Sequence, residues 1–117
     1  RKIDMKPEIN WTDFEKIALH VGTIIEVKDF EAARHPAYQV WIDFGSTIGI
    51  KKSSAQITNR YSKDDLLGKQ IVAVLNFPKK QIATFQSECL ILGAVPSKGD
   101  VVLLATDFRV PNGTEIA

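Results

Sequence analysis

The sequence contains a single cysteine, Cys89, and only two histidines, His20 and His35. One thiol cannot form an internal disulfide, and no group of His, Cys, Asp and Glu residues has metal-ligand spacing. Both histidines stand alone, so we expect them to be structural or surface residues, and we expect Cys89 to be a small core residue. A Gly-x-Ser-x-Gly elbow for nucleophilic catalysis is also missing. We therefore predict a protein that is not an enzyme and that uses no metal or cofactor.

Long apolar runs are missing too. The longest have five residues, as in 71–75 and 101–105, whereas a membrane-spanning helix needs about 20. The first residues are polar and lack the apolar stretch of a signal peptide, so we expect a cytoplasmic protein without membrane insertion. The 117 residues, 44% of them hydrophobic and 25% charged, suffice for one globular domain. We expect an N-terminal arm over 1–11 and the domain over 12–117.

The sequence also lacks a large net charge. Its 15 Lys and Arg nearly balance its 14 Asp and Glu, so the net charge is +1. Binding to phosphates depends on local rather than total charge. Two lysine pairs, Lys51-Lys52 and Lys79-Lys80, have no acidic neighbour in the sequence, and the acids gather elsewhere. These pairs are either solvated surface charge or local cationic sites.

Two helices are marked by capping boxes. Thr12 and Glu15 have capping-box spacing and predict a short helix over about 12–18, with Trp11 as a hydrophobic staple against Ile17 or its neighbours. Ser62 and Asp65 repeat the spacing, with Gly68 as the expected helix stop. The stretch 54–61 also has a helical pattern.

Strand patterns account for most of the remaining sequence. Alternating or continuous apolar residues predict strands over 19–28, 38–44, from 48 onward, 70–77, 88–95 and 101–104. Gly22, inside the first strand, suggests a bend or a close approach of backbones. The helices are too short for parallel crossovers, and closure of an antiparallel sheet removes exposed edges. We predict an all-β fold, a five-stranded Greek-key OB barrel with short flanking helices.

The segments 51–57 and 76–88 carry the most informative chemistry. Each combines lysines with hydroxyl or amide groups and with apolar or aromatic side chains. Lysines contact phosphates, polar side chains contact base edges or 2′-hydroxyls, and aromatic rings stack unpaired bases. RNA binding, peptide binding and an ordinary surface loop all remain open on this evidence. The segment 45–53 is not a nucleotide phosphate loop, because its glycines are one residue too close together.

The same segments carry a family resemblance. The run Lys-Lys-Ser-Ser-Ala-Gln-Ile-Thr at 51–58 is specific to one branch of the tRNA-binding OB domains, and similarity extends over roughly 12–116. Further matching stretches are 13–16, 21–24, 33–34, 36–38, 42–45, 48–50, 74–78, 81–83, 87–88, 92–94 and 110–114. The chain resembles the CsaA family, small proteins described as export-related chaperones.

The resemblance implies an OB barrel, a homodimer, a tRNA-binding surface and a chaperone role in protein export, with tRNA and unfolded or export-bound polypeptides as partners. It assigns RNA binding to Lys52, Ser53, Ser54, Asn76, Lys80, Ile82 and Ser87. We add Lys51 and Lys79, because they complete the two lysine pairs. Relatives often have Arg where this chain has Lys80, and Lys cannot make the bidentate contact of a guanidinium. The alternative is a peptide-binding chaperone with an apolar groove of Phe77, Ile82 and Phe85, for which RNA binding is incidental.

Several of these residues have equally ordinary structural explanations. Asn76 could cap a turn before Pro78, and Ser87 with Glu88 could order the loop through hydrogen bonds to the backbone. Phe85 is as well suited to the core as to stacking on a base. Trp41 could cover the barrel against the N-terminal helix or lie at a dimer contact.

Overall fold

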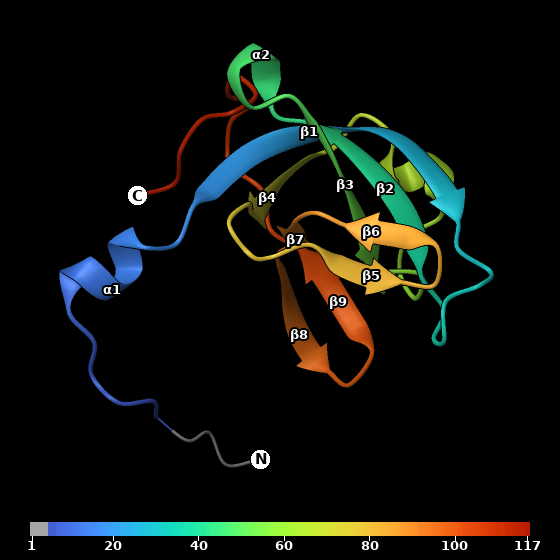
Figure 1. Cartoon of the computed structure of the whole chain (residues 1–117), viewed down its shortest axis with the longest axis horizontal. Coiled ribbons are helices and arrows are strands. Elements are labelled where there is room, and N and C mark those ends of the chain that lie inside the picture. The colour runs from blue at the N-terminus through green and yellow to red at the C-terminus, as the bar shows by residue number, and fades with distance from the viewer. Residues whose placement is uncertain (1–4) are drawn as a thin grey trace.

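The computed structural model describes residues 5–117 and shows a small barrel of antiparallel strands with two hairpins attached (Figure 1). The elements in chain order are α1 (Trp11–Glu15), β1 (Leu19–Asp29), β2 (Tyr38–Asp43), α2 (Gly45–Ile48), β3 (Ile50–Ala55), α3 (Lys63–Leu66), β4 (Gln70–Val74), β5 (Lys80–Ile82), β6 (Phe85–Ser87), β7 (Leu90–Ile91), β8 (Gly93–Ser97) and β9 (Asp100–Leu103). The main sheet has the strand order β3-β2-β1-β4-β7, all antiparallel. The predicted five-stranded OB-type barrel is confirmed.

The barrel nearly closes where the chain before β7 meets β3. The Glu88 N–H donates to the Lys52 carbonyl at 2.8 Å, and the Ser53 hydroxyl donates to the Cys89 carbonyl at 2.8 Å. The remaining strands pair as two separate hairpins, β5–β6 and β8–β9. Closure therefore joins both edges of the main sheet, and it does so inside the segments that carry the lysine pairs.

Gly22 allows the strands of the barrel to approach closely, as its place in β1 suggested. A Cβ atom at this position would lie 2.6 Å from both Ile42 Cγ2 and Phe44 Cδ1. Both of these side chains are buried in the main core. A larger residue at position 22 would displace them, so the close approach depends on glycine.

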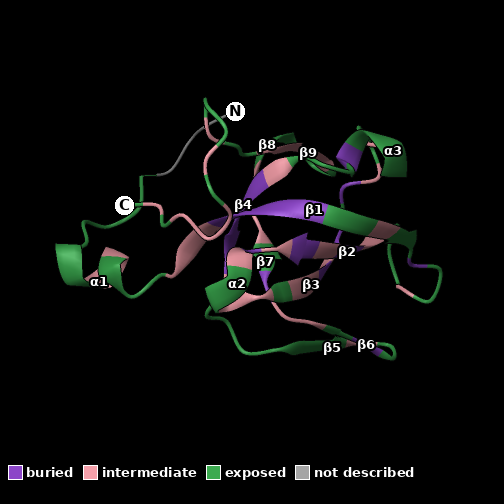
Figure 2. Ribbon diagram, turned by 90° about the horizontal axis from the view of Figure 1, so that it is seen from above, coloured by how far each residue is buried: buried purple, intermediate pink, exposed green. Residues whose placement is uncertain are grey.

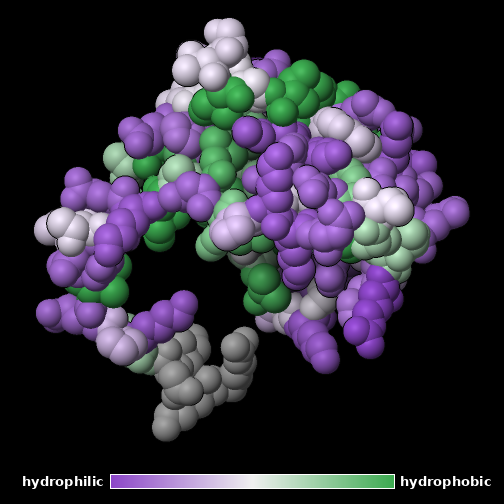
Figure 3. Space-filling model, viewed as in Figure 1, coloured by the Kyte–Doolittle hydropathy of each residue, from purple (hydrophilic) through white to green (hydrophobic). Residues whose placement is uncertain are grey.

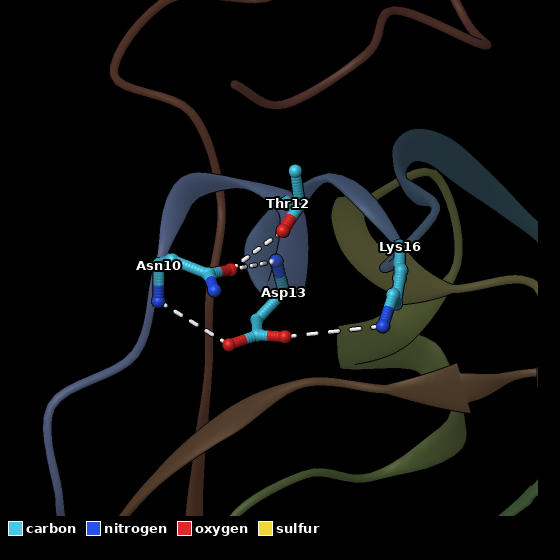
Figure 4. Close-up of polar contacts among 4 residues, drawn as sticks. All are labelled: Asn10, Thr12, Asp13 and Lys16. Carbon is cyan, nitrogen blue, oxygen red and sulfur yellow. Dashed lines mark hydrogen bonds and ion pairs between the residues drawn. The ribbon is translucent and has the colours of Figure 1, made fainter.

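The start of α1 differs from the prediction. Asn10, rather than Thr12, is the N-cap, and the capping box joins Asn10 to Asp13 (Figure 4). The Thr12 hydroxyl instead donates to Asn10 Oδ1 at 2.6 Å. The helix ends at Glu15 rather than near 18. Trp11 is 84% exposed, so the expected hydrophobic staple is wrong.

The helix predicted over 54–61 is also wrong, because its first residues belong to β3. Tyr38 pairs with Ala55 and Gln39 with Ser54 across the β2–β3 ladder, so tertiary pairing decides the backbone there. The capping box at Ser62 is confirmed, and Gly68 follows α3 with a φ of 83°. The apolar segment 70–77 is a strand only to Val74.

The strand predicted over 88–95 is divided between the barrel and the second hairpin. β7 (Leu90–Ile91) pairs with β4, and β8 (Gly93–Ser97) pairs with β9. The predicted last strand, 101–104, corresponds to β9.

The N-terminal region lies apart from the barrel (Figures 1 and 2). Residues 5–10 are exposed and have no regular secondary structure, and residues 1–4 of the expected arm lie outside the described residues. The division into an arm over 1–11 and a domain over 12–117 stays a prediction. None of the helices in the described chain is both long and apolar enough to cross a membrane.

Candidate nucleic-acid interface

The β5–β6 hairpin lies against β3 (Figure 2). One buried aromatic ring of the hairpin packs against residues of the barrel side. Phe85 is only 6% exposed, and its ring centroid lies 5.3 Å from that of Phe30 and 5.9 Å from that of Trp41. With Ala37, these residues form a second small apolar cluster outside the main core, which we call the hairpin cluster (Phe30, Ala37, Trp41 and Phe85). Phe85 is therefore a buried packing residue, which is one of the two roles that the sequence left open.

Hydrogen bonds join the two candidate segments side by side. The Ser54 N–H donates to Ser87 Oγ at 3.0 Å, and the Lys52 N–H donates to Glu88 Oε1 at 3.0 Å. The Glu88 N–H returns a bond to Lys52, as described above. Ser87 and Glu88 thus order the chain through backbone contacts, and they hold the hairpin segment beside β3.

The four lysines of the two pairs do not act as equivalent charges. Lys51 and Lys52 are neighbours on β3, so their side chains leave opposite faces of the strand. Lys52 Nζ lies 5.0 Å from the Phe85 ring centroid, a cation–π contact. Lys79 Nζ lies 3.7 Å from Glu88 Oε2, which offsets its charge. Within residues 5–117, no carboxylate lies within ion-pair distance of Lys80, so its charge faces solvent uncompensated.

Two candidate residues use their side chains within the fold. The Ala18 N–H donates to Asn76 Oδ1 at 3.0 Å, and Asn76 Nδ2 donates to the Lys16 carbonyl at 2.6 Å. Asn76 therefore fixes the connection between α1 and β1 instead of capping a turn before Pro78. Ser53 is 1% exposed and bonds to Cys89, so its hydroxyl does not reach the surface.

A pocket opens between β3 and the hairpin. Its volume is about 260 Å³, and it is lined by Ser54, Gln56, Phe77, Pro78, Lys80, Ile82, Ser87, Cys89 and Leu90. We call it the hairpin pocket. It brings together Ser54, Lys80, Ile82 and Ser87 of the candidate RNA set with Phe77 and Ile82 of the peptide alternative. Phe85 is absent from the lining, because its ring belongs to the hairpin cluster.

Sequence reasoning left Gln56, Pro78 and Leu90 out of the candidate site. Gln56 fell within the wrongly predicted helix, whereas it actually follows β3 directly and reaches the pocket. The amide in the run 51–58 was the available signal. Leu90 begins β7 and enters the pocket only because the barrel closes there.

Burial determines the chemistry of the single thiol. Loss of solvent around Cys89, helped by the charge of Glu88, raises the pKa of its thiol to about 12. A protonated thiol is a poor nucleophile. His20 is likewise structural, since its Nδ1 lies 2.9 Å from the Gly113 carbonyl.

Hydrophilic side chains cover the hairpin on the face seen in Figure 3. A barrel with exposed lysine, amide and hydroxyl groups beside a partly apolar pocket has the composition of a nucleic-acid-binding OB domain. The family model described as "Putative tRNA binding domain" matches residues 19–115. The chain therefore belongs to this tRNA-binding domain family.

Similarity to solved structures shows which branch of this family the chain resembles in sequence and fold. The chaperone CsaA from Bacillus anthracis str. Ames is 51% identical and superimposes with a TM-score of 0.90, over 95% of this chain and 100% of that one. The CsaA chaperone protein from Picrophilus torridus is 54% identical, with a TM-score of 0.87 over 94% of this chain and 100% of that one. The resemblance to the CsaA family is confirmed, and the chain is of CsaA type.

Longer proteins contain a similar segment. The methionine–tRNA ligase of Thermococcus onnurineus is 32% identical over 108 residues, which are 92% of this chain and 14% of the ligase. The corresponding ligase of Methanothrix thermoacetophila is 30% identical over 115 residues, or 98% of this chain and 16% of the ligase. The chain thus spans about one seventh of these relatives. Its family is a tRNA-binding domain rather than an enzyme class, although in these ligases the domain is joined to an enzyme.

Proposed function

We propose that this protein binds tRNA without catalysing a reaction, through the face formed by β3 and the β5–β6 hairpin. The observation that carries the proposal is the hydrogen-bonded contact between β3 and the hairpin segment. Lys52 lies over the Phe85 ring of the hairpin, and Lys80 lies opposite Ser87 in the hairpin ladder. Ser54, Ile82 and Ser87 line the hairpin pocket together with Lys80, and Lys79 lies beside Glu88. Ser53 and Asn76 contribute through the fold of the site, and Lys51 contributes a nearby positive charge.

We propose that the protein forms a homodimer, and the exposed apolar residues around α1 support this proposal. Met5, Ile9, Trp11 and Ile17 are all exposed. A pocket beside them is lined by Trp11, Phe14, Ile17 and the C-terminal residues 115–117. A second copy would cover these side chains, and two binding faces on one RNA would raise the avidity of a nearly neutral chain. Sedimentation of the intact protein as a monomer at micromolar concentration would remove this part of the proposal.

We also propose a cytoplasmic location and a chaperone role in protein export, on the strength of the likeness to CsaA chaperones. The competing function is peptide binding at the exposed apolar lining, with RNA incidental. Phe77, which is 57% exposed, and Ile82 are the residues that favour it.

A salt titration separates the two functions. Each phosphate contact with a lysine releases counterions, so the logarithm of the tRNA affinity should fall with the logarithm of salt concentration by roughly 0.7–0.9 per contact. Binding of an uncharged apolar peptide should hardly change. A tRNA affinity independent of salt would overturn the proposed mechanism.

Removal of two lysine charges tests which face of the protein binds tRNA. In the double variant Lys52→Gln, Lys80→Gln, we expect weaker tRNA binding and a smaller salt slope, while the melting temperature changes little. The matched control is Lys69→Gln, Arg109→Gln, because these two cations line a different pocket. Equal losses of affinity in both double variants would show that the hairpin face is not the specific site.

A further inference from the structure

The hairpin pocket differs from the rest of the face in having polar groups that no neighbour uses. Among residues 5–117, no hydrogen bond or ion pair engages the Ser54 hydroxyl, the Gln56 amide or the Lys80 ammonium. Ser87 Oγ accepts a bond from Ser54 N–H and keeps its own hydrogen free to donate. By contrast, the nearby side chains of Asn76 and Glu88 make hydrogen bonds or ion pairs within the fold at both of their polar atoms. The unused groups therefore gather in one concavity.

Part of the apolar lining of the same pocket is exposed. Phe77, Pro78 and Leu90 are exposed, whereas Ile82 is half-buried and also packs against the hairpin cluster. Flat apolar surfaces of this kind accept the face of an unstacked base, which aromatic side chains bind independently of its identity. Amide and hydroxyl groups can donate to and accept from base edges.

Size limits what the pocket can hold. Its volume of about 260 Å³ lies below the roughly 300–1,000 Å³ of sites for drug-sized ligands. A single flat ring system fits this volume better than a folded segment. Lys80 at the pocket provides a cation for the phosphate attached to such a ring.

We propose that the hairpin pocket receives one unpaired nucleobase of the bound RNA, with Phe77 contacting the base face, Gln56 the base edge and Lys80 the adjoining phosphate. This inference rests on the proposed function and adds a substrate class, because an RNA with an unstacked nucleotide is favoured over a continuous duplex. A basic face alone would bind both kinds of RNA through their phosphates.

The test compares a short single-stranded oligoribonucleotide with an abasic strand of the same length and charge, by fluorescence anisotropy of labelled strands. We expect the strand with bases to bind roughly tenfold more tightly, as stacking of one base allows. Phe77→Ala and Gln56→Leu should each reduce this ratio and leave the abasic strand unaffected. Lys80→Gln should weaken both strands. Phe108→Ala is the matched control, since Phe108 is an exposed aromatic residue outside the pocket.

The outcomes separate this inference from the proposed function. Equal binding of the two strands, with intact tRNA binding, would overturn the base pocket and leave the tRNA function standing. Equal binding of the two strands together with an absence of tRNA binding would overturn both the base pocket and the proposed tRNA function. If Phe77→Ala weakened the binding of an uncharged apolar peptide but changed the binding of neither RNA strand, the pocket would be assigned to polypeptides. The Gln56 side chain is exposed and follows β3 outside regular secondary structure, so Gln56→Leu should fold even if a change at Phe77 does not.

Discussion

The barrel and the β5–β6 hairpin differ in how they are held. The barrel has ladders of paired strands around a main core that has ten buried members within residues 5–117. The hairpin has three residue pairs of its own and is held to the barrel by the small hairpin cluster and by bonds from Ser87 and Glu88. Regions with few buried contacts open at lower free energy than the core. The more stable part of the molecule and the part that carries the candidate site are therefore distinct.

The largest expected effect is on the reactivity of Cys89, which lies where the two regions meet. With its pKa raised to about 12, the folded thiol at pH 8 should react with iodoacetamide about a thousandfold more slowly than an ordinary exposed cysteine. Mass spectrometry over time measures the rate. A rate near that of unfolded protein would mean that the junction is open.

Phe44→Ala should cause the largest loss of stability. Phe44 is 1% exposed in the barrel core, and removal of a buried phenylalanine ring costs about 4 kcal/mol. Urea denaturation measures the change. Cys89 modification should accelerate in parallel, because the whole barrel is weakened.

Phe85→Ala should cost less, about 2 kcal/mol, because the hairpin can shift to close the space that a core residue would leave empty. We expect tRNA affinity to fall and Cys89 to react faster while the barrel stays folded, which hydrogen exchange can follow region by region. If Phe85→Ala is as destabilising as Phe44→Ala, barrel and hairpin unfold as one unit and the comparison is wrong.

The smallest effect concerns the capping box of α3, which belongs to the barrel side. Hydrogen bonds from the Ser62 N–H and from its side chain hold the pKa of Asp65 below its usual value. The folded state thus favours the carboxylate, and its contribution is present above pH 4 and is lost as the pH falls through the lowered pKa. Asp65→Ala should therefore lower the urea midpoint slightly at pH 7 and not at pH 2. An equal difference at both values would contradict the assignment.

Local patterns predicted the strands well and the helices less well. The β1 strand and the Ser62 capping box depend on neighbouring residues, and both appear in the structure. The strict alternation expected along β1 is wrong, because a bulge between Ile24 and Glu26 leaves Ile24 buried and Ile25 exposed. Residues 54–61 failed because pairing of β3 with β2 outweighs local helix propensity. Thr12 lost its cap role to Asn10, which has the same spacing to Asp13.

The candidate site was partly predictable, because some of its features are also local patterns in the sequence. Lysine pairs and polar runs are visible in the sequence, and they did mark the segments that meet at the hairpin pocket. The sequence could not tell that Asn76 binds the backbone near α1, that Ser53 is buried, or that Lys79 is paired with Glu88. Each of these contacts joins residues whose proximity depends on the folded chain.

Alternation of apolar residues and scarcity of cysteine, histidine and long apolar runs determined the class of this protein: a small barrel with local cationic segments. Only the tertiary structure decided which cations and polar groups remain available at the surface. The physical reason is that strand period and capping are properties of adjacent residues, whereas burial and pairing arise when distant segments, here 51–56 and 76–90, are brought together by closure of the sheet.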